Sequence, residues 1–196
     1  MADTLQRLTL PSLSSLEVVV VLPYKWNPPV IWNQMAFHRF CIHSESYKTL
    51  RTLFLLHVAV APADLFDCLA ELKVLREFVV ADHPAVGDTP EHVLLTDQVF
   101  RRLAEHSPAP RLIPELAVFG CLSLLRFDEA VYLDFVRSRV DHRKGSEFES
   151  HIRWHSSSAR ELNPAVSEEL QRLSKEQGFM GSIDAANEQE MQTFFY

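Results

Sequence analysis

Apolar residues recur at one spacing in four segments of this chain. In each segment, an apolar residue is followed by others three, six and eight positions later. The four sets are Leu10, Leu13, Leu16 and Val18; Tyr47, Leu50, Leu53 and Leu55; Leu72, Leu75, Phe78 and Val80; and Ile113, Leu116, Phe119 and Cys121. The last two positions alternate with period two, as in a strand with one buried face, and the earlier three-residue steps suit a tight turn. The spacing therefore predicts four similar units, each a turn followed by a strand.

The segments between these strands carry apolar residues at helical spacing. We expect helices over 32–43, 63–72, 96–106 and 128–139, the third beginning with Thr96 as a capping residue. Strands joined by helices are parallel, and stacked units bury together the apolar side that one unit cannot bury alone. The predicted fold class is α/β: a short, irregular leucine-rich-repeat solenoid with its parallel sheet on the concave side and its helices on the convex side. This fold requires Leu16, Leu53, Phe78 and Phe119 to lie side by side in adjacent strands.

The intervals between the units are irregular. Successive units begin 37, 25 and 41 residues apart. Only the middle interval falls in the range of about 20–29 residues typical of a leucine-rich repeat. The longer intervals require insertions, which we place at 24–30 and 82–91 because both segments contain prolines. A generic α/β domain with four apolar runs is the alternative fold.

The composition divides the chain into four parts. Residues 1–140 hold the repeat-like units, and residues 141–162 are polar and indicate a surface loop or insert. Residues 163–184 predict a capping helix, with Asn163 as its cap and Gly178 at its end, followed by a short strand over 179–183. This last unit would close the open end of the stack, and the acidic tail at 185–196 is expected to fray.

Charge and hydropathy narrow the class of partner. The net charge is −7, whereas binding to nucleic acid requires a concentrated basic face, so we expect no nucleic-acid partner. The longest apolar stretches, such as 16–23 and 53–63, are too short to cross a bilayer, and the N-terminus lacks the pattern of a secretory signal. Three cysteines at no metal-like spacing favour a reducing compartment, and we expect a cytoplasmic or nuclear protein with no membrane partner.

Five phrases, taken in order, carry a family resemblance. They are LTLPSLSSLEV at 8–18, LKVLREFVVAD at 72–82, LTDQVFRRLAEHSPAPRLIPEL at 95–116, LRFDEAVYLDFVRSR at 125–139 and ELQRLSKEQGFMGSID at 169–184. They resemble the repeat region of fungal F-box-like leucine-rich-repeat proteins, over roughly residues 5–185. The resemblance implies the substrate-recognition region of a ubiquitin ligase. The F-box itself, which docks a Skp-type adaptor, has no counterpart in or before Leu5, so an adaptor is expected as a partner only if an F-box exists upstream.

Candidate chemistry in the sequence is sparse. Two groups of side chains could be read as metal ligands: His38, Cys41 and His43, and His151 and His155 with Glu147 and Glu149. The first group lacks a fourth ligand, and the second lacks the His-Glu-x-x-His pattern and lies among serines. The chain contains no Gly-x-Ser-x-Gly motif and no glycine-rich phosphate loop. We therefore predict no catalytic residue, no metal and no cofactor.

The outward-facing strand residues are the predicted contacts with a protein partner, whose identity the sequence does not reveal. They are Glu17, Val19, Arg51, Phe54, Leu56, His57, Arg76, Glu77, Val79, Asp82 and Val118. Exposed Phe54, Leu56 and Val79 would supply apolar anchors among charges, although Phe54 and Leu56 could equally be core residues of a sheet buried on both faces. The predicted function is a protein-interaction module. The alternatives are an orphan repeat fragment without its own activity, or a small cytosolic hydrolase with an unrecognised site.

Overall fold

The computed structural model describes residues 5, 7–20, 30–82, 94–105, 111–123, 127–143, 147–155 and 163–186. Most of the predicted insertions at 24–30 and 82–91 lies outside these residues. So do most of the predicted tail at 185–196 and part of the predicted insert at 141–162.

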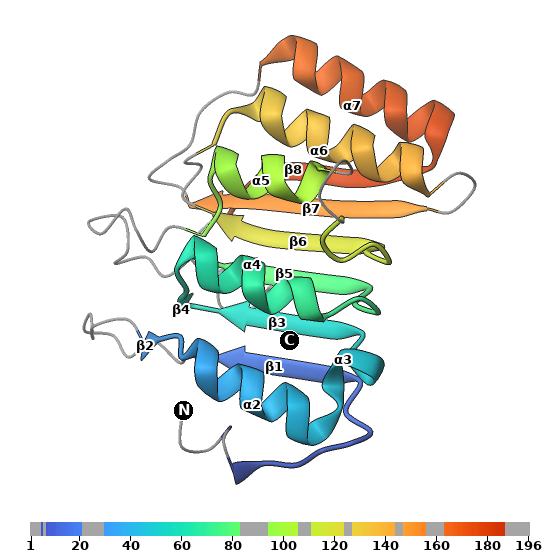
Figure 1. Ribbon diagram of the computed structural model, residues 1–196. Helices are drawn as coiled ribbons and strands as arrows, with labels where there is room; N and C mark the ends of the chain where they lie inside the picture. The colour runs from blue at the N-terminus through green and yellow to red at the C-terminus, as the bar shows by residue number, and fades with distance from the viewer. Residues whose placement is uncertain are drawn as a thin grey trace.

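Six parallel strands form one sheet, in which they lie side by side in the order in which they occur along the chain. They are β1 (Ser15–Val19), β3 (Thr52–Leu56), β5 (Glu77–Ala81), β6 (Val118–Ser123), β7 (Phe148–His155) and β8 (Phe179–Ala186). The helices between them are α2 (Gln34–Ser44), α4 (Pro62–Glu71), α5 (Asp97–Ala104), α6 (Glu129–His142) and α7 (Pro164–Gln177). All five lie on the same face of the sheet (Figure 1). The predicted α/β class is confirmed. A short helix, α3 (Ser46–Thr49), and a second small sheet of β2 (Val30–Ile31) and β4 (Val58–Ala59) complete the described elements.

The register of the sheet aligns the four apolar sets. Leu16 pairs with Leu53, Leu53 with Phe78, and Phe78 with Phe119, so the four residues form one row across β1, β3, β5 and β6. A second row on the same face consists of Val18, Leu55, Val80 and Cys121. The side-by-side placement required by the sequence pattern is therefore confirmed.

The residues before these strands also share a local structure. A backbone hydrogen bond spans the first three-residue step in three units, from Leu13 N to Leu10 O, from Leu75 N to Leu72 O and from Leu116 N to Ile113 O, at 3.0–3.2 Å. In the remaining unit, helix α3 replaces the turn, and Leu50 N donates to Ser46 O at 2.8 Å. The predicted tight turn therefore forms in three units, and one helical turn stands in its place in the fourth.

The start of each following strand is held by a shared carbonyl. Ser14 O accepts hydrogen bonds from the N–H groups of both Arg51 and Thr52. Arg51 O accepts in the same way from Arg76 and Glu77, and Arg76 O accepts from Ala117 and Val118. One carbonyl facing two successive donors is the geometry of a β-bulge, which increases the twist of the strand locally. The same device recurs across four neighbouring strands.

Strand β7 corrects the expected loop at 141–162. Its residues alternate: Phe148, Ser150 and Ile152 are buried, whereas Glu149 and His151 point to the other face and are partly exposed. The middle inward position holds a serine, which weakens the apolar alternation in the sequence. Ser150 is tolerated there because its Oγ accepts a hydrogen bond from the Tyr132 hydroxyl at 2.9 Å. The polar composition of this segment therefore concealed the fifth strand of the sheet.

The helices occupy the expected segments, and side-chain caps begin several of them. Asn33, Asp128 and Asn163 each accept a hydrogen bond from a backbone N–H in the first turn of α2, α6 and α7, respectively. Gly178 ends α7 with a φ of 71°, a left-handed conformation that glycine adopts without strain. Thr96 departs from its predicted role, because its side chain makes no capping hydrogen bond at the start of α5.

The core lies between the sheet and the helices and is rich in aromatic rings. Phe100 of α5 contacts Phe119, Phe127, Tyr132 and Phe135, with ring centroids 4.7–5.9 Å apart. Several of these contacts are edge-to-face, the arrangement favoured by the charge distribution of aromatic rings. The cluster ties α5 and α6 to the centre of the sheet.

A fully buried arginine lies within this layer. The guanidinium of Arg139 on α6 donates to the carbonyls of Leu103 and Leu112 through Nη2 and of Ile113 through Nη1, at 2.7–3.0 Å. Burial, followed by the charges of two neighbouring arginines, lowers the pKa of Arg139 to about 9. The side chain satisfies the carbonyls where the chain leaves α5 and approaches β6, including Ile113, whose φ is 39°.

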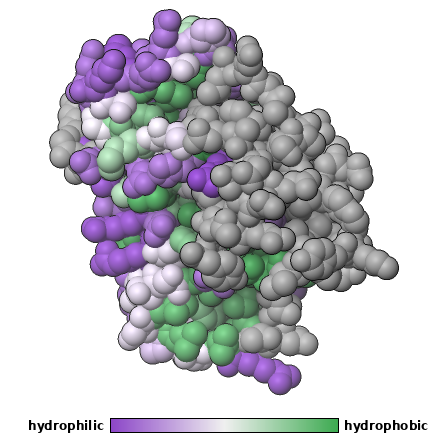
Figure 2. Space-filling view, turned by 180° about the vertical axis from the view of Figure 1, so that it is seen from behind, coloured by the Kyte–Doolittle hydropathy of each residue, from purple (hydrophilic) through white to green (hydrophobic). Residues whose placement is uncertain are grey.

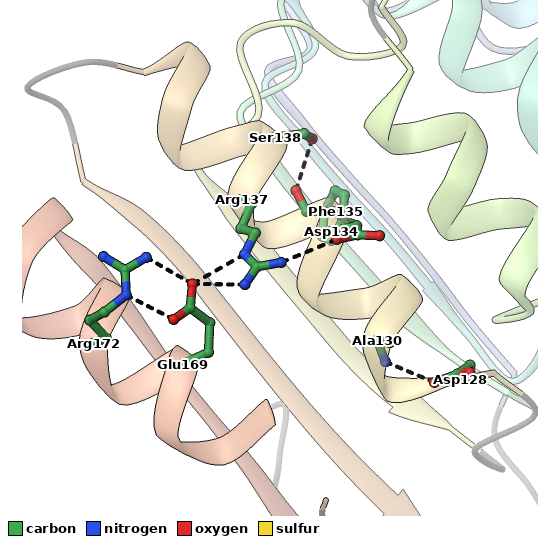
Figure 3. Close-up of polar contacts among 8 residues, drawn as sticks. All are labelled: Asp128, Ala130, Asp134, Phe135, Arg137, Ser138, Glu169 and Arg172. Carbon is green, nitrogen blue, oxygen red and sulfur yellow. Dashed lines mark hydrogen bonds and ion pairs between the residues drawn. The ribbon is translucent and has the colours of Figure 1, made fainter. Parts of the chain in front are cut away.

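Helix α7 joins α6 through an ionic network (Figure 3). The Glu169 carboxylate lies between the guanidiniums of Arg172 and Arg137, which it contacts at 2.8 Å, and Arg137 also reaches Asp134 at 3.5 Å. Hydrogen bonds from Arg172, then from Arg137, lower the pKa of Glu169 to about 2. The network orients the last helix over the last strands of the sheet.

Candidate interaction surface

We call the side of the sheet opposite the described helices the open face, because no helix of the described residues covers it. Its side chains alternate with those of the core, and the register places them in rows across the strands. The row nearest the strand starts contains Ser15, Thr52, Glu77, Val118, Glu149 and Met180. The next row contains Glu17, Phe54, Val79, Gly120, His151 and Ser182. On this face, hydrophilic side chains gather toward the side at which the strands begin (Figure 2).

Two adjacent arginines mark the starts of β3 and β5. Arg51 and Arg76 are exposed, and their backbones are joined by the hydrogen bond from Arg76 N to Arg51 O at 2.8 Å. Within the described part of the chain, neither guanidinium forms an ion pair with a carboxylate. Beside them, the Thr52 hydroxyl contacts the Glu77 carboxylate at 3.3 Å. The strand starts therefore present paired positive charges to solvent.

The expected apolar anchors are mostly buried, which corrects the prediction of their exposure. Leu56 and Val79 are only 2% and 6% exposed, and they form a second apolar cluster with Ala81 and Leu122. Phe54 is partly buried and packs against the same cluster. The central strands are apolar on both faces toward their carboxyl ends, which is typical of a parallel sheet. Alternation alone does not show which outward residue is covered.

His57 and Asp82, two further predicted contacts, stabilise the carboxyl ends of β3 and β5. His57 has a left-handed φ of 60°, donates its N–H to Ala81 O and places Nδ1 3.3 Å from Asp82 O. Burial lowers the pKa of His57. Asp82 is 4% exposed, and its carboxylate accepts a hydrogen bond from Leu94 N at 2.9 Å. Asp82 is therefore buried, and the prediction that it is exposed to a partner is wrong.

The remaining predicted contacts stay accessible. Glu17, Val19, Arg51 and Arg76 are exposed, and Glu77 and Val118 are half-buried. With Phe54, they span β1 and the starts and middles of β3, β5 and β6. The register pairs Glu17 with Phe54 and Glu77 with Val118, and Arg51 and Arg76 directly precede β3 and β5. We call these seven residues the open-face strip.

A polar group at the other end of this face joins His151 and Glu149, which the sequence suggested only as metal ligands, to Ser182, which the sequence did not single out. His151 Nδ1 lies 3.2 Å from Ser182 Oγ, and His151 Nε2 lies 2.6 Å from Glu149 Oε1. The signal that could have indicated half of it is Glu149-x-His151, two residues on one face of a strand. The contact with Ser182 follows only from the pairing of β7 with β8.

The three side chains first considered as metal ligands, His38, Cys41 and His43, have separate environments in the fold. His38 contacts Glu71, Cys41 is buried, and His43 is exposed on α2. Burial raises the pKa of the Cys41 thiol to about 12, which disfavours the thiolate that binds metals. In the part of the chain that the structure describes, no three His, Cys, Asp or Glu side chains are grouped as a metal site would require.

The topology differs from that of α/β folds that bind ligands at a reversal of strand order. Here each strand lies beside its sequence neighbour, so the described sheet has no such reversal. Among the described residues, no helix combines the length and apolar character needed to cross a bilayer. No family model, curated protein or solved structure matches this chain.

Proposed function

We propose that this protein is a short leucine-rich-repeat-like solenoid that binds another protein through its open-face strip. The observation that supports this best is the sequential order of six parallel strands, with the five helices described between them all on the same face. Doubly wound α/β domains cover both faces of their sheet with helices. A sheet covered by helices on one side leaves the other available to a partner, as in other stacked-repeat proteins.

The recurring local structure supports the repeat interpretation. A turn, a carbonyl shared by two donors and a strand with two inward apolar residues recur from unit to unit. The strands of each unit pair with those of neighbouring units, and the units together build the main core from local pieces. The two longer intervals then correspond to enlarged connections that leave the strand spacing unchanged.

The charges of the strip indicate the chemistry of the partner. Arg51 and Arg76 are exposed at the starts of neighbouring strands. Val118 N donates to Arg76 O, and Phe54 follows three residues after Arg51. Guanidinium groups bind carboxylates with paired hydrogen bonds, and apolar side chains surrounded by charges are typical anchors of interfaces. The strip is therefore suited to a protein segment with carboxylates near an apolar side chain. A role in substrate recognition by a ubiquitin ligase follows from the family resemblance alone, with a Skp-type adaptor only if an F-box lies upstream.

Charge reversal tests this function. The Arg51→Glu/Arg76→Glu variant should lose the protein partners that the tagged wild-type chain retains in quantitative affinity purification from its native cells. Arg39→Glu is the matched control, because Arg39 is exposed on α2, on the helix side of the sheet. The urea midpoints of both variants should stay near the wild-type value, because exposed charges contribute little to stability. Partners that survive the double reversal but are lost with Arg39→Glu would contradict binding through the open face.

A further inference from the structure

Three side chains on the last two strands form a connected chain of hydrogen bonds. Ser182 on β8 lies directly beside His151 on β7 in the register, with 3.2 Å between Ser182 Oγ and His151 Nδ1. On the far side of the ring, Glu149 Oε1 lies 2.6 Å from Nε2. His151 and Glu149 are each 38% exposed, so the group is open to small molecules. A hydroxyl, an imidazole and a carboxylate in this order form the constellation that activates a serine for nucleophilic attack.

We propose that Ser182 is a nucleophilic serine that reacts with small, activated acyl esters, with His151 as its general base and Glu149 as a positioning residue. The hydrogen bond to Glu149 selects the imidazole tautomer that carries its proton on Nε2. Nδ1 is then free to accept the hydroxyl proton of Ser182. The proposal is independent of partner binding by the open-face strip.

A groove beside β8 reaches Ser182 from the side of the sheet that carries α7. It has a volume of 340 Å³ and lies between α7 and the edge of the sheet, where its lining includes Leu170, Phe179, Gly181 and Ser182. This volume lies in the range of small-molecule sites, roughly 300–1,000 Å³. Leu170 and Phe179 make part of this lining apolar, which suits a short aliphatic or aromatic acyl chain. Because Ser182 Oγ lies with His151 on the opposite face, the acyl chain would have to reach the groove around the edge strand β8.

The edge position of β8 supplies candidate donors for the developing negative charge. In the described sheet β8 pairs with β7 alone, so alternate N–H groups along its outer side are not used by another strand. Phe148 N donates to Gly178 O, which directs the backbone groups of Met180 and Ser182 toward β7 and those of Gly181 outward. The Gly181 N–H therefore stands next to the nucleophile as a donor for an oxyanion.

The reaction follows from these positions. Ser182 Oγ attacks the ester carbonyl carbon while its proton passes to His151 Nδ1. The bond to the alcohol then breaks, His151 returns the proton to the departing alkoxide, and the acyl group remains on Ser182. Water, deprotonated by the same nitrogen, hydrolyses the acyl-serine, which releases the carboxylic acid and restores both side chains.

Labelling with an alkyl fluorophosphonate tests the proposal directly. Intact and peptide mass spectrometry should find one phosphonyl adduct on Ser182, with fluoride as the leaving group. Ser182→Ala should abolish this adduct, and His151→Gln should slow its formation by roughly 100-fold or more, the usual contribution of a general base. Ser174→Ala is the matched control, because Ser174 lines the same groove without a histidine hydrogen bond and its removal should leave labelling unchanged.

Hydrolysis of p-nitrophenyl acetate separates positioning by Glu149 from a merely structural role. Glu149→Gln should lower the acylation rate while the urea midpoint and the adduct site stay unchanged. An absence of any Ser182 adduct in folded wild-type protein would overturn the proposal. Equal labelling of the wild type and His151→Gln would overturn it as well, because Ser182 would then be merely accessible.

Discussion

The two faces of the sheet are built from alternate residues of the same strands, yet they differ in how uniformly they are filled. On the helix side, Leu53, Phe78 and Phe119 form a row that is completely buried. One residue further along each strand, the open-face row changes from half-buried Phe54 to buried Val79 to Gly120. The helix side is a continuous core, and the open face is a surface whose composition varies from strand to strand.

The open face itself changes along the strand direction. Near the strand starts, it carries the partly accessible side chains of Thr52 and Glu77, and the exposed Arg51 and Arg76 directly precede these two residues. Near the strand ends, Leu56, Ala81 and Leu122 are buried in a cluster separate from the main core. On β3, β5 and β6, the second half of this face is therefore buried, and substitutions in its two halves should have different consequences.

Neighbouring residues of β3 provide the largest expected contrast between the faces. Leu53→Ala should destabilise the protein by about 2–5 kcal/mol, because it leaves a cavity in a core without exposed surface. Phe54→Ala should cost less in urea unfolding, since the ring is only partly buried, and it should weaken partner binding instead. If Phe54→Ala destabilised the protein as much as Leu53→Ala, both faces of the sheet would be equally well packed, and the contrast between them would fail.

The sequence predicted the helix side well because its signal is local. The turn, the strand start and the two inward residues all lie within nine positions, as between Leu72 and Val80, and their spacing persists in spite of irregular intervals. Strand β7 was missed because Ser150 occupies an inward position where an apolar residue was expected. Its acceptability depends on Tyr132, eighteen residues away.

The open face could not be predicted with the same success. The pattern identified Leu56 and Val79 as outward residues, and they do alternate with the core. Their burial depends on contacts that alternation does not encode. The same holds for Asp82, which is buried and accepts a hydrogen bond from Leu94 N. The meeting of Ser182 with His151 likewise requires the register between two strands that are joined through α7. Spacing reveals local periodicity, whereas surface chemistry arises from long-range pairing.

Substitution of Arg139 tests whether packing alone explains why changes on the helix side of the sheet destabilise the protein. Arg139→Met keeps much of the side-chain length but leaves the carbonyls of Leu103, Leu112 and Ile113 without their donor. Each buried acceptor that loses its partner costs roughly 1–3 kcal/mol, although some relaxation is expected. Urea unfolding should therefore show a clear loss, which Arg139→Lys restores poorly because one ammonium cannot replace the planar fork.

Arg137→Met is the control for this prediction. Arg137 is two residues away on α6, is 45% exposed and binds Glu169 at the surface. Its loss should change stability by less than about 1 kcal/mol, as is usual for exposed ion pairs. Equal effects at positions 137 and 139 would show that the buried hydrogen bonds of Arg139 add nothing beyond a surface charge.

The smallest expected effect concerns His57, at the buried end of the open face, and appears only as a dependence on pH. Burial lowers the pKa of His57 from its usual value of 6.5, so the unfolded chain binds a proton more readily than the folded chain. The stability associated with neutral His57 is fully present above about pH 6.5, and it is lost as the pH falls toward the lower pKa of the folded state.

His57→Asn should reduce the difference between the urea midpoints at about pH 7.5 and about pH 5.5, because asparagine does not titrate there and tolerates the left-handed φ. His43→Asn, at an exposed histidine of α2, is the comparison. A pH dependence that His57→Asn leaves unchanged would show that the carboxyl end of β3 is as accessible to water as its start, and the division of the open face into two halves would fail.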